Sequence, residues 1–182
     1  MVDHVSPLLS RIRQDRALDG LMDGFEFDLK GADHVEFVRL SSGAKLEPVA
    51  GCGAGGTYFL CGEGPGEDRP VLYADSEGSA ALLADDLRGA LTIIVGLPTW
   101  HDCHFDRPGG LEATIAEAEK FHQEWLTYEA DYDDDSATVA DALGLELAPR
   151  PELIRRLHAA WSRTVPDYVL LNEWDGAYEL LF

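Results

Sequence analysis

Three short apolar segments constrain the fold of this chain more than any other part of the sequence. They span residues 45–50, 57–61 and 71–74, with glycine-rich turns between them. Each segment is rich in β-branched or aromatic residues and is bounded by glycine, proline or acidic residues, which is typical of consecutive strands. We therefore expect a β-meander between residues 45 and 75.

The first turn of this meander contains a literal G-x-G-x-x-G pattern at Gly51, Gly53 and Gly56. In a dinucleotide site this pattern opens a helix whose N-terminus meets the pyrophosphate. Here a strand-like segment follows the glycines, and no lysine follows that would complete a loop for nucleoside triphosphates. The glycines are therefore predicted to form a turn that uses their freedom at positive φ, and no cofactor is expected.

The segment before the meander carries signals for a helix and two extended stretches. Ser6 and Pro7 suit an N-cap and a first helical position, so a helix is expected from here to the turn signals at residues 19–24. Alternating apolar residues predict an edge strand or irregular arm at residues 25–29. The same alternation predicts a strand at residues 34–40.

A helix is predicted directly after the meander, with its entrance at residues 76–79. Its apolar positions recur at helical spacing, at Leu83, Leu87, Ala90, Leu91 and Ile94. The end of this helix is open, because residues 92–95 also favour a strand. Gly96 and Pro98 stop either element.

The last third of the chain is predicted to be mainly helical. The strongest helical pattern covers residues 111–126. Ser136 is expected to cap a short helix that ends at Gly144, and Pro151 to start another. Residues 168–171 are predicted to form a short strand or an extended segment.

This order of elements indicates the fold class. Strands and helices are segregated along the chain, which favours α+β architecture with a mixed or mostly antiparallel sheet flanked by helices. The 182 residues fit one domain, with a helical C-terminal third from about residue 107.

The charge balance excludes several classes of partner. Thirty-four acidic and 14 basic residues give a net charge of −20. Nucleic acid and anionic membranes are therefore not expected as direct partners, because both attract Lys and Arg. The charge is either the general surface of an acidic soluble protein or an attraction for a basic protein partner.

Cysteine usage and hydropathy indicate a cytoplasmic protein. Cys52, Cys61 and Cys103 are an odd number at irregular spacing, which is not a disulfide framework, so reduced thiols are expected. The N-terminus has no apolar run of signal-peptide length. No stretch approaches the roughly 20 apolar residues of a membrane span.

The highest concentration of negative charge lies before the predicted short helix. It consists of Glu129, Asp131, Asp133, Asp134 and Asp135. One interpretation is a solvated, mobile loop, and the other is a contact surface for a basic protein. The stretch lacks the glycine of an EF-hand loop, which argues against calcium. Of the neighbouring aromatic residues, Trp125 is expected in the core, while Tyr128 and Tyr132 suit either the core or an interface.

Residues 100–104 (Trp-His-Asp-Cys-His) hold the densest group of potential metal ligands. Three ligands within four residues are too close for a common tetrahedral zinc site, so no metal is expected. A nucleophilic arrangement of Cys103, His101 and Asp102 would also need a base within reach and an oxyanion site, and the sequence shows neither. The alternatives are a small metal-dependent hydrolase that uses this connector, or a packed connector with Trp100 and Phe105 buried.

Three segments together resemble the SUKH superfamily, which includes Smi/Knr-type proteins and many bacterial immunity proteins. They are residues 53–61, residues 70–78, and an acidic amphipathic helix that ends in residues 94–100. The resemblance covers about residues 45–105. It implies an α+β fold and a binding role without catalysis, and it brings no catalytic residues to this chain.

Bacterial members of this superfamily are commonly immunity proteins that neutralise a cognate toxin, often a nuclease. The resemblance therefore implies an immunity protein whose acidic surface covers a basic toxin domain. A housekeeping regulatory adaptor of the same fold is the alternative.

Overall fold

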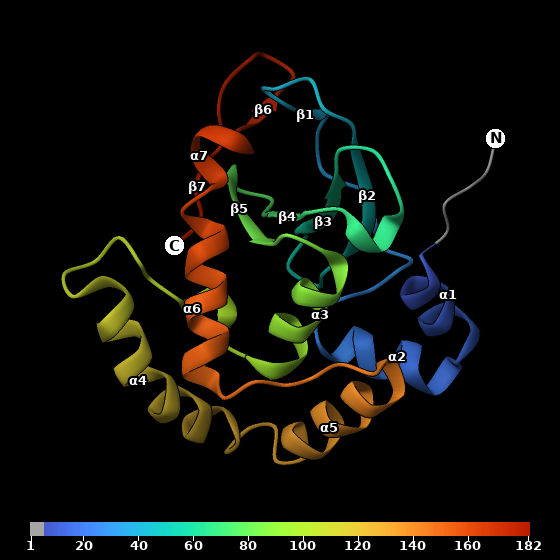
Figure 1. Cartoon of the computed structure of the whole chain (residues 1–182), viewed down its shortest axis with the longest axis vertical. Helices are drawn as coiled ribbons and strands as arrows, with labels where there is room; N and C mark the ends of the chain where they lie inside the picture. The colour runs from blue at the N-terminus through green and yellow to red at the C-terminus, as the bar shows by residue number, and fades with distance from the viewer. Residues whose placement is uncertain (1–5) are drawn as a thin grey trace.

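The computed structural model describes residues 6–182 and shows an α+β fold (Figure 1). The strands of this region are β1 (Val38–Leu40), β2 (Leu46–Gly51), β3 (Thr57–Cys61), β4 (Val71–Ala74), β5 (Ser79–Ala84), β6 (Leu170–Asn172) and β7 (Glu179–Leu180). The α-helices are α1 (Pro7–Gln14), α2 (Arg16–Gly24), α3 (Leu87–Gly96), α4 (Gly110–Trp125), α5 (Tyr132–Leu143), α6 (Arg150–Trp161) and α7 (Thr164–Asp167). Short 3₁₀ turns lie at η1 (Gly66–Asp68) and η2 (Trp100–Asp102).

The predicted meander forms strands β2, β3 and β4 of the main sheet, whose strand order is β2-β3-β4-β5-β7. The first four strands are antiparallel, and β7 pairs in parallel with β5. Phe59 of β3 lies opposite Pro48 of β2 and Leu72 of β4. The mixed, mostly antiparallel sheet expected from the sequence is thus confirmed. A separate antiparallel ribbon of β1 and β6 lies at one end of the molecule, and α2, α4 and α5 lie at the other (Figure 1).

Both faces of the main sheet are buried. Because side chains alternate along a strand, Tyr58 and Leu60 of β3 face the large cluster formed with helices α1, α2, α3, α5 and α6. Phe59 and Cys61 face a smaller cluster that includes Leu40 and Leu170 of the ribbon. Apolar side chains on both faces tie the sheet to the helices and to the ribbon.

The predicted start of the helix after the meander was wrong. Residues 79–84, predicted as the first part of a helix, form strand β5, and helix α3 begins only at Leu87 after the N-cap Asp86. The Asp86 carboxylate accepts a hydrogen bond of 2.6 Å from the Gly89 amide, which fixes this start. Residues 92–95, for which the sequence allowed either a helix or a strand, belong to helix α3.

The N-terminal predictions were correct in part. Ser6 is the N-cap of α1, as expected, and accepts a hydrogen bond from the Leu9 amide. The single predicted helix is divided, because Asp15 ends α1 and caps α2. Residues 25–29 contain only an isolated bridge between Asp28 and Gly51, and the predicted strand at 34–40 is limited to β1.

The second half of the acidic stretch is helical where a mobile loop was one expectation, while Glu129 and Asp131 lie in the connection before α5. Helix α5 begins at Tyr132, so Ser136 lies within the helix and is not its cap. Asp133, Asp134 and Asp135 occupy the first turn, where carboxylates interact favourably with the helix dipole. Gly144 ends the helix in the left-handed conformation, as predicted.

The C-terminal third contains α4 to α7 and also the short strands β6 and β7. Within residues 6–182, no helix is both long enough and apolar enough to cross a membrane. Trp100 and Phe105 are buried, as expected for a packed connector.

Candidate functional site

A cavity of about 630 Å³ opens at the end of the molecule that carries α2, α4 and α5. Its walls come from the end of α2 and the residues after it, the end of α3, the turn η2, and the connection from α4 into α5. Ligand pockets in proteins commonly measure about 300–1,000 Å³. The cavity therefore has a suitable size for a small ligand or for a side chain of a partner protein.

Aromatic residues form much of the wall. They are Phe25, Trp100, Trp125, Tyr128 and Tyr132. The ring of Tyr132 packs edge-on against Phe25, with centroids 5.2 Å apart, and against Trp125 at 6.5 Å. Trp125 is half-buried against the core, while the Tyr128 ring is 84% exposed at the rim. The two tyrosines left open by the sequence thus differ, because Tyr132 is buried and Tyr128 is not.

Two hydroxyl groups hold α5 against the end of α3. Tyr132 and Ser136 each donate a hydrogen bond of 2.7 Å to the carbonyl oxygen of Val95. Val95 lies in the last turn of α3, where carbonyl groups have no partner within the helix. Burial raises the pKa of the Tyr132 phenol, so the group stays a neutral donor. These bonds fix the wall of the cavity in place.

Four carboxylates also line the cavity. Glu129, Asp131 and Asp135 come from the predicted acidic stretch, and Glu26 comes from the segment after α2. The Glu26 carboxylate accepts a hydrogen bond of 2.7 Å from the Gly53 amide, which places it beside the turn of the meander. Among the described residues that line the cavity, none is lysine or arginine. The cavity is therefore a site of negative potential.

His101 lines the same cavity and does not offset this charge. Its ring lies against Trp100, with centroids 3.4 Å apart, and edge-on to Tyr73. Burial lowers the pKa of His101 to about 4, because the charged imidazolium is poorly solvated there. The imidazole is thus neutral near pH 7.

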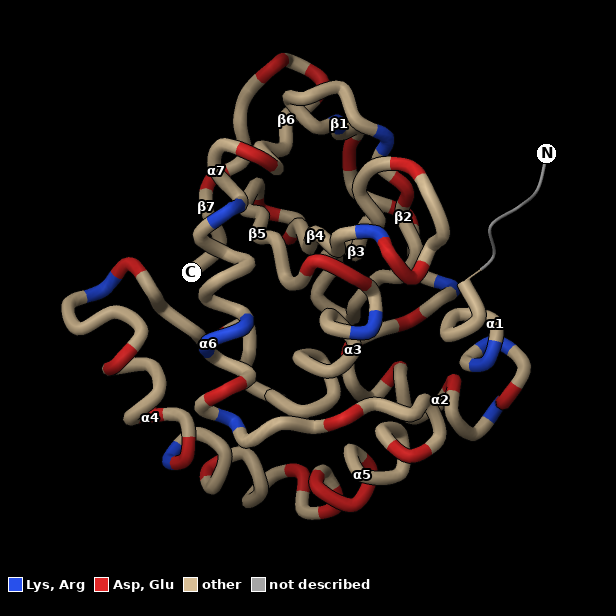
Figure 2. Tube along the Cα trace, in the orientation of Figure 1, with Lys and Arg blue, Asp and Glu red and all other residues tan. Residues whose placement is uncertain are grey.

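The five predicted contact residues divide into three groups. Glu129, Asp131 and Asp135 line the cavity, and Asp134 is exposed next to it on the first turn of α5. Figure 2 shows the acidic residues following one another into α5. Asp133 is not among the residues that line the cavity, because its carboxylate contacts other helices.

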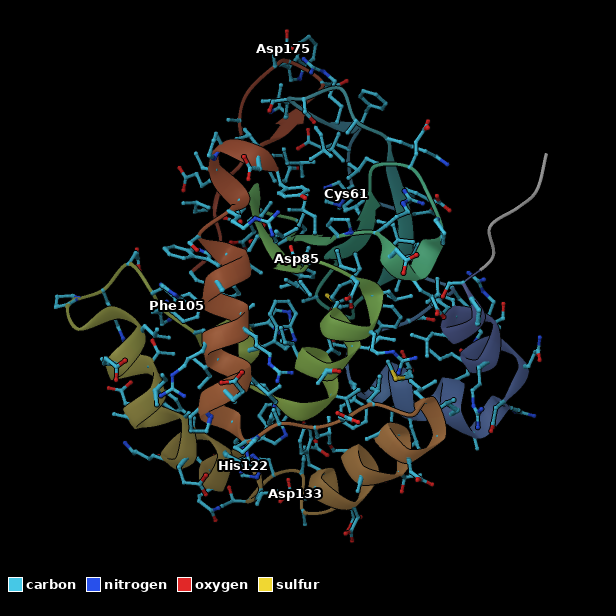
Figure 3. All side chains as sticks on the ribbon, in the orientation of Figure 1. Cys61, Asp85, Phe105, His122, Asp133 and Asp175 are labelled. Atoms are coloured by element: carbon cyan, nitrogen blue, oxygen red, sulfur yellow. The ribbon has the colours of Figure 1, made fainter. Side chains whose placement is uncertain are left out.

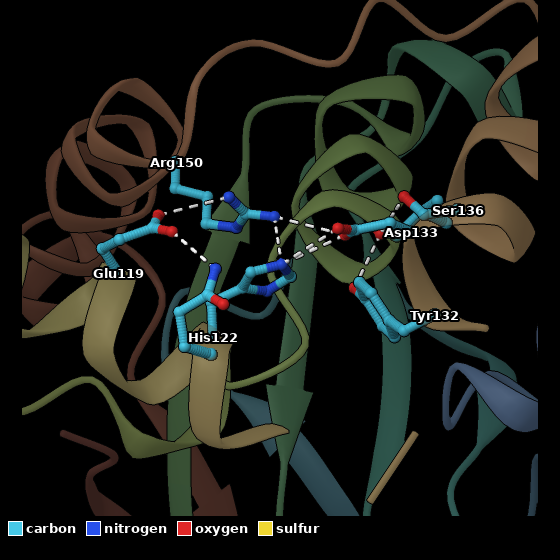
Figure 4. Close-up of polar contacts among 8 residues, drawn as sticks. Glu119, His122, Tyr132, Asp133, Ser136 and Arg150 are labelled. Carbon is cyan, nitrogen blue, oxygen red and sulfur yellow. Dashed lines mark hydrogen bonds and ion pairs between the residues drawn. The ribbon is translucent and has the colours of Figure 1, made fainter. Parts of the chain in front are cut away.

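Asp133 belongs to a polar cluster that joins α4, α5 and α6 (Figures 3 and 4). Its Oδ1 atom lies 3.1 Å from Nε2 of His122 on α4 and 3.2 Å from Nη2 of Arg150 on α6. Arg150 also contacts His122 directly and lies 3.4 Å from the Glu119 carboxylate. The His122 side chain is almost fully buried. Asp133 thus has a structural role in holding the three helices together.

The connector at residues 100–104 does not assemble the chemistry considered for it. Burial raises the pKa of the Cys103 thiol to about 12, so the thiol is protonated and a poor nucleophile. His104 is exposed, while His101 faces the cavity. Within residues 6–182, no three His, Cys, Asp or Glu side chains are arranged to hold a metal ion.

The glycine-rich segment is a turn between β2 and β3, as predicted. Gly55 adopts a φ of 87°, which favours glycine. A Cβ atom on Gly56 would lie 2.0 Å from the Tyr73 hydroxyl oxygen, and one on Gly51 would lie 1.9 Å from the Gly31 carbonyl oxygen. The glycines thus allow close packing, and strand β3 follows where a dinucleotide motif would open a helix.

Sequence reasoning missed the contribution of Phe25, Glu26 and His101 to the cavity. Phe25 and Glu26 lie in a segment predicted as an edge strand or irregular arm. His101 lies in the connector at residues 100–104, which was considered only as a source of metal ligands or of a nucleophilic group. No periodicity or spacing links these residues to the acidic stretch, because only tertiary packing brings them together.

Comparisons of the chain with protein-family models, curated proteins and solved structures found no match. The structure itself defines the class: an α+β protein with an acidic and aromatic cavity at its helical end. The relation to the SUKH superfamily stays a prediction.

Proposed function

We propose that this chain is a non-catalytic protein-binding module that contacts a basic partner through the face around the cavity. The observation that carries the proposal is the set of four carboxylates around an aromatic cavity that no lysine or arginine of the described residues lines. A negative, partly enclosed surface attracts and orients a positively charged partner. The net charge of −20 extends this attraction beyond the cavity.

The partner we propose is a basic toxin domain, for which the chain would act as an immunity protein. A nuclease toxin needs a basic surface, because lysine and arginine bind the phosphates of its substrate. An acidic module that covers such a surface blocks the substrate and neutralises the toxin. The SUKH resemblance of the meander supports this choice of partner.

A charge-matched pair of variants tests the proposed face. The first variant carries Glu129→Gln, Asp131→Asn and Asp135→Asn at the cavity. The control carries Glu63→Gln, Asp68→Asn and Glu173→Gln, which are exposed on the β3–β4 connection and after β6. Both remove three negative charges, so they change the overall field equally and differ only in position.

The partner is captured from the native host with the tagged chain as bait, identified by mass spectrometry and purified as a domain. Its association rate constant is then measured by stopped-flow fluorescence over a range of salt concentrations. We expect the cavity variant to lower this constant about tenfold with a weaker salt dependence, and the control about twofold. Equal effects of both variants, or an acidic partner, would contradict the proposal. A partner that is not a toxin would identify a cellular adaptor.

A further inference from the structure

The cavity combines two features that a flat acidic surface lacks. Carboxylates of Glu129, Asp131 and Asp135 come from its α4–α5 side, and the rings of Trp125 and Tyr128 lie along the same stretch of chain. Aromatic faces carry negative charge density and attract cations. The site therefore suits a ligand that carries a positive charge and also presents an apolar or flat surface.

A divalent metal ion fits the cavity poorly. Such ions take several oxygen ligands at short distances, and no three of the described carboxylate, histidine or cysteine side chains are gathered in that way. Phosphate and other anions are repelled by the four carboxylates. Of the charged ligands, an organic cation fits this lining best.

Among organic cations of proteins, the guanidinium of arginine matches this wall better than the ammonium of lysine. Guanidinium is planar and weakly hydrated, stacks on aromatic rings and offers five N–H donors to carboxylates. The lysine ammonium is strongly hydrated and loses more on entering a partly enclosed aromatic site. The wall supplies both aromatic rings and carboxylates, which is the combination that guanidinium uses.

We propose that the cavity binds one arginine side chain of the partner protein, with the guanidinium facing the carboxylates of Glu129, Asp131 and Asp135 and resting against the aromatic wall. The inference rests on the proposed function, because it names the part of the basic partner that enters this site. It is also testable by a measurement that does not need the partner.

The test uses three capped tripeptides, acetyl-Gly-X-Gly-amide, in which X is arginine, lysine or citrulline. Citrulline has nearly the shape of arginine and no charge. Binding to the full chain is followed by two-dimensional ¹⁵N NMR, in which each tryptophan indole gives its own signal. We expect saturable shifts of the Trp100 and Trp125 indole signals with arginine, binding about fivefold weaker with lysine, and no saturation with citrulline. Equal binding of citrulline and arginine would overturn the proposal.

Two variants and one control locate the site. Tyr128→Ala removes an exposed ring, so the fold should be retained, and Asp131→Asn removes one lining carboxylate. Each is expected to weaken arginine-peptide binding about fivefold. Asp134→Asn removes a neighbouring exposed charge that does not line the cavity and should leave the affinity unchanged. Loss of affinity in the Asp134 variant equal to that in the other two would contradict a pocket.

The failures of the two proposals are distinguishable. If the cavity variant slows association with the partner but no arginine peptide binds, the binding module stands and the arginine pocket does not. If the arginine peptide binds at the cavity but the partner associates at the same rate with both triple variants, the pocket stands and the proposed function does not.

Discussion

The main sheet and the helical end of this molecule, which carries α2, α4 and α5, differ in how their buried polar groups are paired. In the sheet, the nearly buried Arg69 donates to the carbonyl oxygens of Leu60 and Cys61 and pairs with Glu47 at 2.6 Å. At the helical end, buried polar atoms without a partner among the described residues accumulate. They belong to Arg107, His122, Trp125 and Arg150, whereas Tyr58 is the sheet residue with such an atom.

Buried polar groups in folded proteins are nearly always paired, because an unpaired group costs free energy. Arg69 follows this rule, whereas the hydroxyl of Tyr58 in β3 does not. Of the four residues at the helical end, Trp125 lines the cavity with its four carboxylates, whereas Arg107, His122 and Arg150 do not.

The largest expected effect lies in the sheet. Arg69→Met keeps an unbranched apolar stem but removes the guanidinium, which leaves two carbonyl groups of β3 without this donor. We expect the free energy of unfolding to fall by about 3 kcal/mol. Urea unfolding monitored by circular dichroism measures this change.

Lys45→Met is the matched control for Arg69. Lys45 pairs with the same Glu47 carboxylate at 3.3 Å, but its side chain is exposed. An exposed ion pair contributes little, so this variant should lose less than about 0.5 kcal/mol. Similar losses for Lys45→Met and Arg69→Met would show that the buried pairing in the sheet has no special role.

The second prediction concerns His101 in the cavity wall. Its pKa is about 4 in the folded chain and 6.5 for an ordinary histidine, so the unfolded chain takes up the proton first as the pH falls. The stability that His101 contributes is therefore fully present above pH 6.5 and is lost progressively down to about pH 4. This loss should be on the order of 2 kcal/mol.

The His101 contribution is isolated by comparing variants. His101→Phe keeps a ring against Trp100 and cannot titrate, so its free energy of unfolding should fall less than that of the wild type between about pH 7.5 and about pH 4.5. His104→Gln changes an exposed histidine of the same connector and is the control. An unchanged slope in His101→Phe would mean that folding does not lower the pKa of His101.

The smallest effect distinguishes two neighbouring carboxylates of α5. Asp133→Asn weakens the contacts with His122 and Arg150, and because Asp133 is partly exposed we expect a loss of about 1 kcal/mol. Asp134→Asn removes only a favourable interaction with the helix dipole, so the free energy of unfolding should fall by roughly a few tenths of a kcal/mol. Thermal unfolding measures both. A larger loss for Asp134 would reject the structural role of the polar cluster.

The meander and its glycine turn are predictable from the sequence, because glycine and acidic residues mark the ends of each strand. Strand β5 is not, since both of its faces are buried and Ser-Ala-Ala-Leu-Leu-Ala shows no alternation. Helix-favouring alanine and leucine are outweighed there by pairing with β4 and by packing on α6.

The candidate site was predictable only in its acidic part. The sequence shows the concentration of carboxylates, and three of the five line the cavity. It does not show that Asp133 turns to His122 and Arg150, because those residues lie on other helices. The sequence also does not show that Phe25 and Glu26 line the cavity, because they reach it only when α2 packs on α5.

Pro48 in strand β2 has a consequence for how partners can attach. β2 is an edge of the main sheet, and its register shifts between Pro48 and Ala50. Proline has no N–H group, and an irregular edge is a poor template for a further strand. This edge therefore resists both aggregation and binding by strand addition. Under the proposed function, the partner then contacts side chains of the helical end and does not add a strand at this edge.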